Sequence, residues 1–382
     1  MAAALLWQTV VPEGLRLPDI PASEDFSASY LARSGRYQDF LRWNWLAATV
    51  IELVVLVLFV RFGRRFRLRG IMEGVALGVM ALVAVWLAGL PFVLAAQWWR
   101  RRYDVSDAGY GTILVDPWLQ RLGTLAAAAA AIAFFMALAR RLGDRWWLVG
   151  GPAFGVVGAA FVLVLPFLLA PRLAPLRDRA VVRDVQTLAR EQGVGHVDVE
   201  VYDASRRTKA INAEFYGLGP SKRIIIWDTA LARLTRPQLR ALVSHELGHV
   251  EAHHVWKGVG WLFLFALPGA YVVALVTRRR GGLGEPPAVP LAILTVVLLE
   301  LATLPATNAI SRRYEAEADW HSLTTTRDPR AFEGLIGKLT EASLAEPDPP
   351  RAVHVLFGTH PTPMQRIEMA TSLRAEALPG GS

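Results

Sequence analysis

The sequence predicts a mainly α-helical fold, in which a polytopic membrane bundle of about six transmembrane helices carries a small α+β domain. Three observations lead to this fold class. The 382 residues are 53% hydrophobic, and their mean hydropathy of +0.32 is high for a soluble protein. The apolar residues gather in six long stretches instead of spreading evenly. The remaining polar sequence alternates helical and strand-like patterns, which need a folded domain outside the bilayer.

The six apolar stretches are long enough, or nearly so, to cross about 30 Å of hydrocarbon. They are 45–60, 74–96, 122–139, 146–170, 259–276 and 288–310. Tryptophans flank many of them, as residues that anchor at a membrane interface do. The alternative is a large soluble protein with buried core helices, but six such windows rarely coincide in a soluble domain.

The polar segment 171–258, between the fourth and fifth spans, combines both kinds of secondary structure. A helical pattern ends at Gly193. Three strand-like runs follow, at 197–203, 209–217 and 223–228. A further helix is expected to begin after Thr235, which has the side chain of an N-cap, with Pro237 in its first turn.

This last helix contains an H-E-x-x-H motif, from His245 to His249. Four residues make just over one helical turn, so the two imidazoles project from the same face. Two imidazoles in this arrangement can hold one Zn²⁺, with Glu246 beside them as general base for a metal-bound water. The alternative, two ordinary surface histidines, is disfavoured by the helical context. The motif therefore predicts that the α+β domain is a zinc metalloprotease domain.

A catalytic zinc usually has three protein ligands and one open position. The chain has no cysteine, so the third ligand must be a histidine or a carboxylate. Glu315 is the best candidate, because on a helix Asn308, Glu315 and Asp319 lie within about 60° of each other. Glu317 points roughly the opposite way. Asp319, with Asn308 on the same face, would accept a hydrogen bond from a ligating imidazole. The alternative is a solvated acidic helix end.

Four blocks of sequence, in this order, resemble the integral-membrane zinc CAAX prenyl proteases of the a-factor-converting type, which are gluzincins with HExxH and ExxxD motifs. The blocks are NAEFYGLGPSKRIIIWDTAL (212–231), SHELGHVEAHH (244–254), NAISRRYEAEAD (308–319) and HPTPMQR (360–366). The resemblance also covers the spans before the polar segment. The eukaryotic members have one more N-terminal span, and the smaller bacterial heat-shock membrane proteases fit less well. The Ala-, Arg- and Leu-rich composition favours a bacterial member.

The resemblance implies the same three zinc ligands, one zinc ion per chain, and the same base. It implies that His360 and Arg366 line the cleft, where they would stabilise the oxyanion or hold a substrate carboxylate. His254 stands where the family carries a histidine that is not a ligand, whereas His253 is a weaker alternative ligand. The edge strand to which an extended peptide would add, or otherwise an ordinary strand, consists of Ile211, Asn212, Ala213, Glu214 and Phe215.

These assignments divide the chain into five parts. We expect an exposed leader at 1–39, four transmembrane helices at 40–170, a catalytic segment at 171–258, two transmembrane helices at 259–310 and a second catalytic segment at 311–382. The N-terminus lacks the basic start and cleavage site of a signal peptide. The net charge of +8 suits anionic membrane lipids and needs no nucleic-acid partner.

The predicted function is therefore a membrane-embedded zinc endopeptidase of peptide or protein substrates, either prenylated CAAX-type proteins or other membrane-associated ones. A quality-control protease for membrane proteins is the first alternative, and a metal-stabilised scaffold or transporter is the second. The basic residues in the loops barely distinguish the two sides of the membrane. The resemblance places the protein in the cell membrane as a multi-pass protein whose active site faces the cytoplasm.

Overall fold

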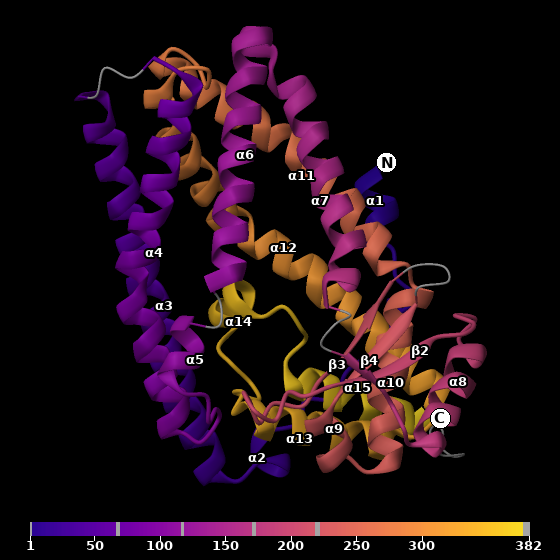
Figure 1. Ribbon diagram of the computed structural model, residues 1–382. Helices are drawn as coiled ribbons and strands as arrows, with labels where there is room; N and C mark the ends of the chain where they lie inside the picture. Colours follow the sequence, from indigo (N-terminus) through magenta and orange to yellow (C-terminus); the bar gives the residue numbers. More distant parts are fainter. Residues whose placement is uncertain (1, 66–68, 116–117, 170–172, 218–221, 377–382) are drawn as a thin grey trace.

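The computed structural model describes residues 2–65, 69–115, 118–169, 173–217 and 222–376. Long helices extend from one end of the molecule, and a small α+β domain lies at the other end (Figure 1). The fold class predicted from the sequence is confirmed: this is a polytopic helical membrane protein that carries a small mixed domain.

Each of the six predicted spans corresponds to one long helix. The helices are α3 (Ala28–Phe62), α4 (Ile71–Arg102), α6 (Trp118–Leu142), α7 (Trp147–Leu169), α11 (His254–Thr277) and α12 (Val289–Thr326). Among the described residues, five helical stretches are long and apolar enough to cross a membrane. The apolar stretch Trp147–Phe161 of α7 is shorter and is not one of these five. Large apolar side chains remain exposed along these helices, as expected of surfaces that face lipid.

The α+β domain is built on a sheet whose described strands have the order β1-β2-β4-β3. They are β1 (Leu173–Pro175), β2 (Asp198–Tyr202), β3 (Ala213–Tyr216) and β4 (Arg223–Trp227). β2 and β4 are parallel, whereas β3 pairs antiparallel with β4 and lies at one edge. Ile224, Ile225 and Ile226 are all buried, which explains the unbroken apolar run of the inner strand β4. The three predicted strands are present, and β1 is an additional one.

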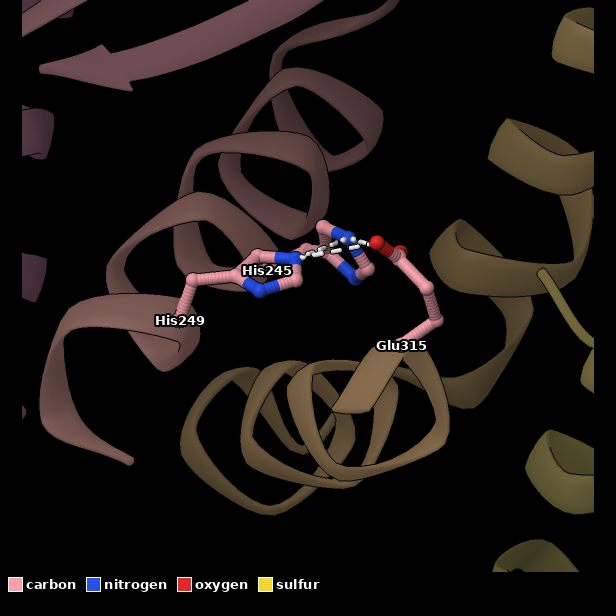
Figure 2. A group of neighbouring side chains, drawn as sticks. All are labelled: His245, His249 and Glu315. Atoms are coloured by element: carbon pink, nitrogen blue, oxygen red, sulfur yellow. Dashed lines mark hydrogen bonds and ion pairs between the residues drawn. The ribbon is translucent and has the colours of Figure 1, made fainter. Parts of the chain in front are cut away.

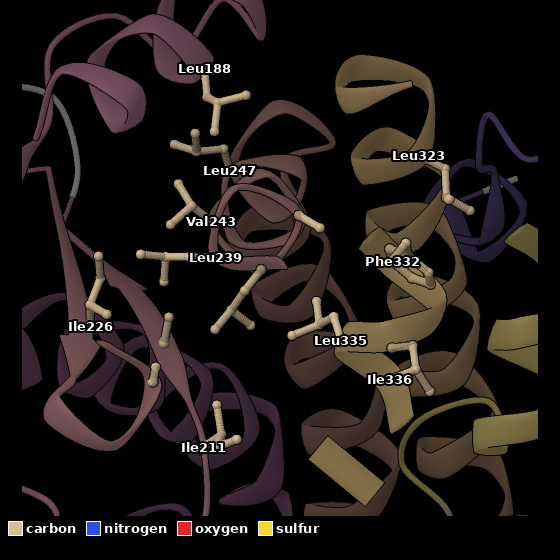
Figure 3. Packing of buried hydrophobic residues seen from close by; sticks show 14 of the residues in the cluster. Leu188, Ile211, Ile226, Leu239, Val243, Leu247, Leu323, Phe332, Leu335 and Ile336 are labelled. Atoms are coloured by element: carbon tan, nitrogen blue, oxygen red, sulfur yellow. The ribbon is translucent and has the colours of Figure 1, made fainter. Parts of the chain in front are cut away.

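Helices pack with this sheet around one core. They are α8 (Arg179–Glu191), α9 (Asp228–Arg233), α10 (Arg236–Glu251), α13 (Pro329–Ser343) and α15 (Pro363–Glu376), whereas the short helix α14 (Arg351–Phe357) packs against α12. Side chains such as Ile226 of β4, Leu188 of α8 and Leu247 of α10 belong to one buried cluster with Leu323 of α12 and Phe332 of α13 (Figure 3). The core of the domain thus combines segments that precede the last two membrane helices in the sequence with segments that follow them.

Two helices lead from the membrane bundle directly into this core. The 38-residue helix α12 runs from its apolar half into the domain without a break. The helix α10 is followed almost at once by α11, with His253 in the left-handed region (φ 57°) at the junction. The start of α10 agrees with the predicted cap at Thr235, because the Thr235 N–H donates to the Gln238 side chain at 3.0 Å.

The N-terminal residues lie along the α+β domain. The helix α1 (Ala2–Trp7) contacts α11, and α2 (Ala22–Asp25) precedes Phe26, which is buried in the domain core. Many of the described side chains before residue 26 are exposed, but the backbone is fixed to the domain by hydrogen bonds. Residues 28–39, which the sequence assigns to the leader, form the start of α3.

Candidate metal centre

Three side-chain donors converge where α10 and α12 cross (Figure 2). His245 and His249 lie on one face of α10, and their Nε2 atoms are 3.2 Å apart. Glu315 of α12 reaches both, with Oε2 at 3.2 Å from Nε2 of His245 and Oε1 at 3.6 Å from Nε2 of His249. The three donor atoms all lie within 4.8 Å of one another. The predicted pair of helices therefore does bring two imidazoles and one carboxylate to a single point.

The arrangement fits a cation. Oε2 of Glu315 is buried and lies 3.2 Å from Nε2 of His245 and of His360, but it accepts no well-directed hydrogen bond from the described residues, which a buried carboxylate oxygen normally does. Burial opposes a positive charge on His245, yet the carboxylates of Asp319 and Glu315 raise the pKa of this histidine to about 10. The same field that would stabilise a proton here would stabilise a metal ion. Two imidazoles and a carboxylate are a donor set typical of catalytic zinc.

A buried carboxylate holds the ring of His245 in place. Oδ1 of Asp319 lies 2.8 Å from Nδ1 of His245, which leaves the Nε2 atom facing Glu315. Asp319 is fully buried and is itself held by Arg366 of α15, whose Nε and Nη2 donate to its two oxygens at 2.8 and 2.6 Å. The negative charge of Asp319 raises the pKa of Arg366 although burial opposes this. Asp319 thus lies beside the second ring nitrogen of His245, the position that the sequence predicts for it.

The ring of His249 is supported by a longer chain of side chains. Nδ1 of His249 lies 2.8 Å from Nδ1 of His254, and Nε2 of His254 lies 2.8 Å from Oε2 of Glu317. Because a carboxylate only accepts, Nε2 of His254 donates to it and Nδ1 of His254 accepts from His249. This tautomer leaves the lone pair on Nε2 of His249 toward Glu315.

The roles of His254 and Glu317 were not predicted. The helix arithmetic correctly places Glu317 on the side of α12 away from Glu315. That side is buried, however, and Glu317 is only 2% exposed. The signal in the sequence was His254 itself, since a histidine just after the motif can reach the second nitrogen of His249.

The proposed base, Glu246, is half-buried, and burial raises its pKa. On the neighbouring edge strand β3, Glu214 accepts hydrogen bonds from the Asn212 amide at 3.0 Å and from the Tyr216 hydroxyl. The charge of Glu246 contributes to raising the pKa of Tyr216, after burial and Glu214 itself. β3 packs against α10, the helix that carries Glu246. Ala213 and Phe215 lie in this strand, and Ile211 is buried just before it.

His360 approaches the centre from the loop before α15. Its Nε2 lies 3.2 Å from Oε2 of Glu315, and 53% of its side chain is exposed. His360 and Arg366 both line a cavity of about 600 Å³ that opens beside the centre. The walls of this cavity also include Ile211, Asn212, Leu41, Trp45, Ile336 and Phe357. Both predicted tail residues thus lie at the site, and Arg366 reaches it through Asp319.

Asn308 lies apart from the metal donors. Its amide donates to the carbonyl oxygens of Val355 at 3.4 Å and Leu356 at 2.7 Å, so it holds α14 against α12. The reason is distance along the helix: seven residues before Glu315 is about 10 Å, although the two side chains share a face. His253 is the junction residue between α10 and α11 and contributes no donor to the described cluster.

Comparisons with known proteins agree with this fold and site. The profile of peptidase family M48 matches residues 175–374. An uncharacterized metalloprotease, YhfN of Bacillus subtilis, is 29% identical over 249 residues, which are 62% of this chain and 58% of that protein. A probable CAAX prenyl protease 1 of Schizosaccharomyces pombe is 29% identical over 206 residues, covering 50% of this chain and 43% of that protein. The chain thus spans about half the length of these relatives.

The crystal structure of Ste24p from S. mikatae has the same fold, with a TM-score of 0.75. It is 17% identical, and the match covers 97% of this chain and 95% of that one. The fold and the converging donors define a multi-pass membrane protein with a metalloprotease-type domain. The chain belongs to peptidase family M48. The family resemblance drawn from the four sequence blocks is confirmed.

Proposed function

We propose that this protein is a membrane-embedded zinc endopeptidase, in which His245, His249 and Glu315 hold one zinc ion per chain. The observation that carries the proposal is the convergence of these three donors within 4.8 Å, beside Glu246. Zinc bound there would polarise the scissile carbonyl and make water a stronger acid. Membership of peptidase family M48 supports a hydrolytic role.

The chain's own residues would move the protons. Glu246 takes a proton from the attacking water and returns it to the leaving amine, and a pKa raised by burial suits both steps. His360, exposed beside Glu315, is available to donate toward the negative charge that develops on the carbonyl oxygen. Asp319 and Arg366 keep His245 in one tautomer throughout, and Asn308 supports the site only by fixing α14.

An extended substrate would add to the open edge of the sheet. Residues 211–215 form or precede β3, whose other side pairs with β4. A peptide added there would pass Glu246 and continue into the cavity of about 600 Å³. The apolar wall of that cavity, which includes Leu41, Trp45 and Phe357, suits aliphatic side chains or the start of a lipid anchor. This supports membrane-associated substrates, prenylated CAAX-type proteins included.

The protein would act as a multi-pass component of the cell membrane, with membrane lipids around its helices and the catalytic domain on the cytoplasmic side. The five long apolar helices support the membrane assignment. The names of relatives, CAAX prenyl protease 1 among them, support a substrate that carries a lipid.

The test is cleavage of a peptide panel, farnesylated CAAX peptides and unmodified ones, by purified wild type and by Glu246→Gln. We expect the variant to keep its zinc and to cleave at least about 100-fold more slowly. Glu315→Ala is expected to lose the metal, as measured by elemental analysis. A Glu246→Gln protein with more than a hundredth of wild-type activity would remove Glu246 from the mechanism.

The panel also separates the alternatives. Cleavage of only the farnesylated peptides would support the proposed substrate class. Cleavage of unmodified peptides alone would assign the protein to membrane quality control. Full zinc content with no cleavage of any peptide would favour the scaffold or transporter.

A further inference from the structure

The N-terminal segment makes an unusual set of contacts close to the metal centre. We define residues 6–10 as the N-terminal strap. Its backbone is bound by side chains from α11 and α12: the Tyr314 hydroxyl donates to the Leu6 carbonyl at 2.7 Å, and Arg313 Nε donates to the Trp7 carbonyl at 2.5 Å. Arg313 also lies over the Trp7 ring, 5.0 Å from its centroid. The strap is therefore fixed by hydrogen bonds to its backbone.

Two further contacts connect the strap to one carboxylate. The Val10 N–H donates to Oε1 of Glu317 at 2.9 Å. Lys257 donates both to Oε2 of Glu317 at 3.2 Å and to the Gln8 carbonyl at 3.0 Å. Glu317 is nearly fully buried, so each of its oxygens needs a partner inside the protein. Among the described residues, the strap supplies the donor to Oε1 directly, and it fixes one of the donors to Oε2.

Glu317 in turn holds the support of a proposed zinc ligand. Its Oε2 accepts from His254, whose other nitrogen accepts from Nδ1 of His249. The His254 ring also stacks on Tyr314, with centroids 4.5 Å apart and planes 12° from parallel. Tyr314 is itself bound to the strap. Both contacts that orient His254 thus lead back to residues 6–10.

We infer that the N-terminal strap is a positioning element for the metal centre: by holding Glu317 and Tyr314 it fixes His254, and through His254 the ring of His249. This inference rests on the proposed function, because it requires that His249 binds the metal. The two histidines are then supported in different ways. His245 relies on Asp319, four residues beyond Glu315 on α12, whereas His249 relies on a segment more than 230 residues before it in the sequence.

The physical basis is the orientation of a metal-binding imidazole. A hydrogen bond to its second nitrogen sets the tautomer and ring direction, and removing such a partner typically weakens metal binding about 10- to 100-fold. If Val10 cannot donate, Glu317 keeps a buried oxygen without a partner. Glu317 would then turn toward water and loosen His254.

The test uses Val10→Pro in the full-length protein, because proline removes the N–H and the Val10 side chain is 56% exposed, so little packing is lost. Val10→Ala, which keeps the N–H, is the matched control. The readout is the rate at which purified, zinc-loaded protein in detergent releases Zn²⁺ to an excess of chelator. We expect release from Val10→Pro to be about tenfold faster than from wild type and from Val10→Ala.

A second variant approaches the same carboxylate from the other side. Lys257→Met removes the remaining strap-linked donor to Glu317 without changing the backbone, and we expect faster zinc release from it as well. Lys338→Met is its control, since Lys338 donates to the Arg233 carbonyl at 2.7 Å and not to Glu317. If Val10→Pro fails to fold, Lys257→Met carries the test alone.

A double-mutant cycle identifies the route. In a Glu317→Met background, Val10→Pro should change zinc release by less than about twofold, because position 317 then has no side-chain oxygen to accept from the Val10 N–H. A full effect in that background, or release at the control rate from both Val10→Pro and Lys257→Met, would overturn the inference. Zinc release needs no substrate, so strap-dependent release without cleavage of any peptide would sink the proposed function and leave the strap's role intact.

Discussion

At the residue scale, the pair formed by Asp319 and Arg366 connects the stability of the domain to its chemistry. Both groups are charged and largely buried, and Arg366 binds Asp319 with two nitrogens. A buried carboxylate that loses such a partner is left uncompensated, which typically costs about 3–5 kcal/mol. Arg366 is therefore expected to act first through Asp319 and the orientation of His245.

We predict that Arg366→Met lowers the thermal midpoint of the purified protein strongly, by a loss of roughly 3 kcal/mol in the free energy of unfolding. Adding Asp319→Asn should recover part of that loss, because the buried charge is then gone. Differential scanning fluorimetry in detergent measures both variants. An Arg366→Met protein that melts like wild type would show that the pair contributes little.

The residues within the motifs were the most predictable part of the site. The spacing of His245 and His249, and the position of Glu315 relative to Asp319 on one helix face, follow from helix geometry alone. The same arithmetic failed for Asn308, because it gives the direction of a side chain and ignores its height along the helix. Glu317 was set aside because it points away from Glu315, yet that direction leads to His254.

At the scale of elements, the close approach of α10 to α12 depends on Gly248. A Cβ atom there would lie 2.9 Å from Cβ of His321, 3.2 Å from the Ala318 carbonyl oxygen and 3.3 Å from Ala318 Cα. Two of these neighbours are backbone atoms, so α12 itself would have to move. A side chain at position 248 would push α12 away from α10, and this would increase the distance between the two histidines and Glu315.

We predict that Gly248→Ala weakens zinc binding about tenfold, since overpacking typically costs 1–3 kcal/mol and about 1.4 kcal/mol corresponds to a factor of ten. Competition with a chelator of known affinity measures the change. Gly258→Ala in α11 is the control, because a Cβ there meets nothing within 4 Å. Equal zinc affinity for both variants would mean that the two helices accommodate the extra methyl group.

The turn between β2 and β3 is joined to α9 by one carboxylate. Asp228 accepts hydrogen bonds from the N–H groups of Ala204, Ser205 and Thr229, at 3.0, 3.0 and 2.8 Å. Burial opposes the charge, but a hydrogen bond from the Ser205 side chain, together with these three backbone bonds, holds the pKa of Asp228 below its ordinary value of 3.8. Because the folded pKa is depressed, the stabilisation is complete above pH 3.8 and is lost as the pH falls through the folded pKa.

We predict that Asp228→Asn destabilises the protein by about 1 kcal/mol at pH 7. The gap in melting temperature between wild type and the variant should shrink as the pH is lowered below about 4. Asp203→Asn serves as the control, because Asp203 is half-exposed and pairs with Arg206 at the surface. A gap that stays constant down to pH 3 would contradict the role of the charge.

Elements with a strong internal pattern were found from the sequence, and the others were not. Three isoleucines in a row predict β4, and the cap residue together with Pro237 predicts the start of α10. β1 is three residues long and ends in proline, so its strand conformation comes only from pairing with β2. No local pattern indicates such a strand.

At the scale of the whole molecule, the proposed metal would join two helices that are separated by a membrane hairpin in the sequence. We predict that removing zinc with a chelator abolishes cleavage and lowers the thermal midpoint, because a ligand bound only to the folded state stabilises it. At a free zinc concentration about 1,000 times Kd, the loss corresponds to about 4 kcal/mol. Readdition of Zn²⁺ should restore both properties. An unchanged midpoint in metal-free protein would show that no metal joins the helices.

The long-range arrangement was only partly readable. The six spans and their order follow from hydropathy, and the meeting of α10 with α12 could be inferred because a catalytic zinc needs a third donor. The path of residues 2–26 along the domain could not be inferred, because its contacts are made mostly by backbone atoms, which leave no signature in the choice of side chains.

The continuity of α12 also fixes how far the candidate metal centre lies from the membrane-spanning part of the helix. Its apolar half is expected to end at residue 310, and Glu315 follows five residues later, which is about 7.5 Å along a helix. His249 likewise precedes by only a few residues the helix α11 that enters the bundle. Under the proposed function, the bond to be cut must therefore lie within a few residues' reach of the bilayer surface. Polypeptide tethered at that depth would be processed, and segments held far out in the aqueous phase would be spared whatever their sequence.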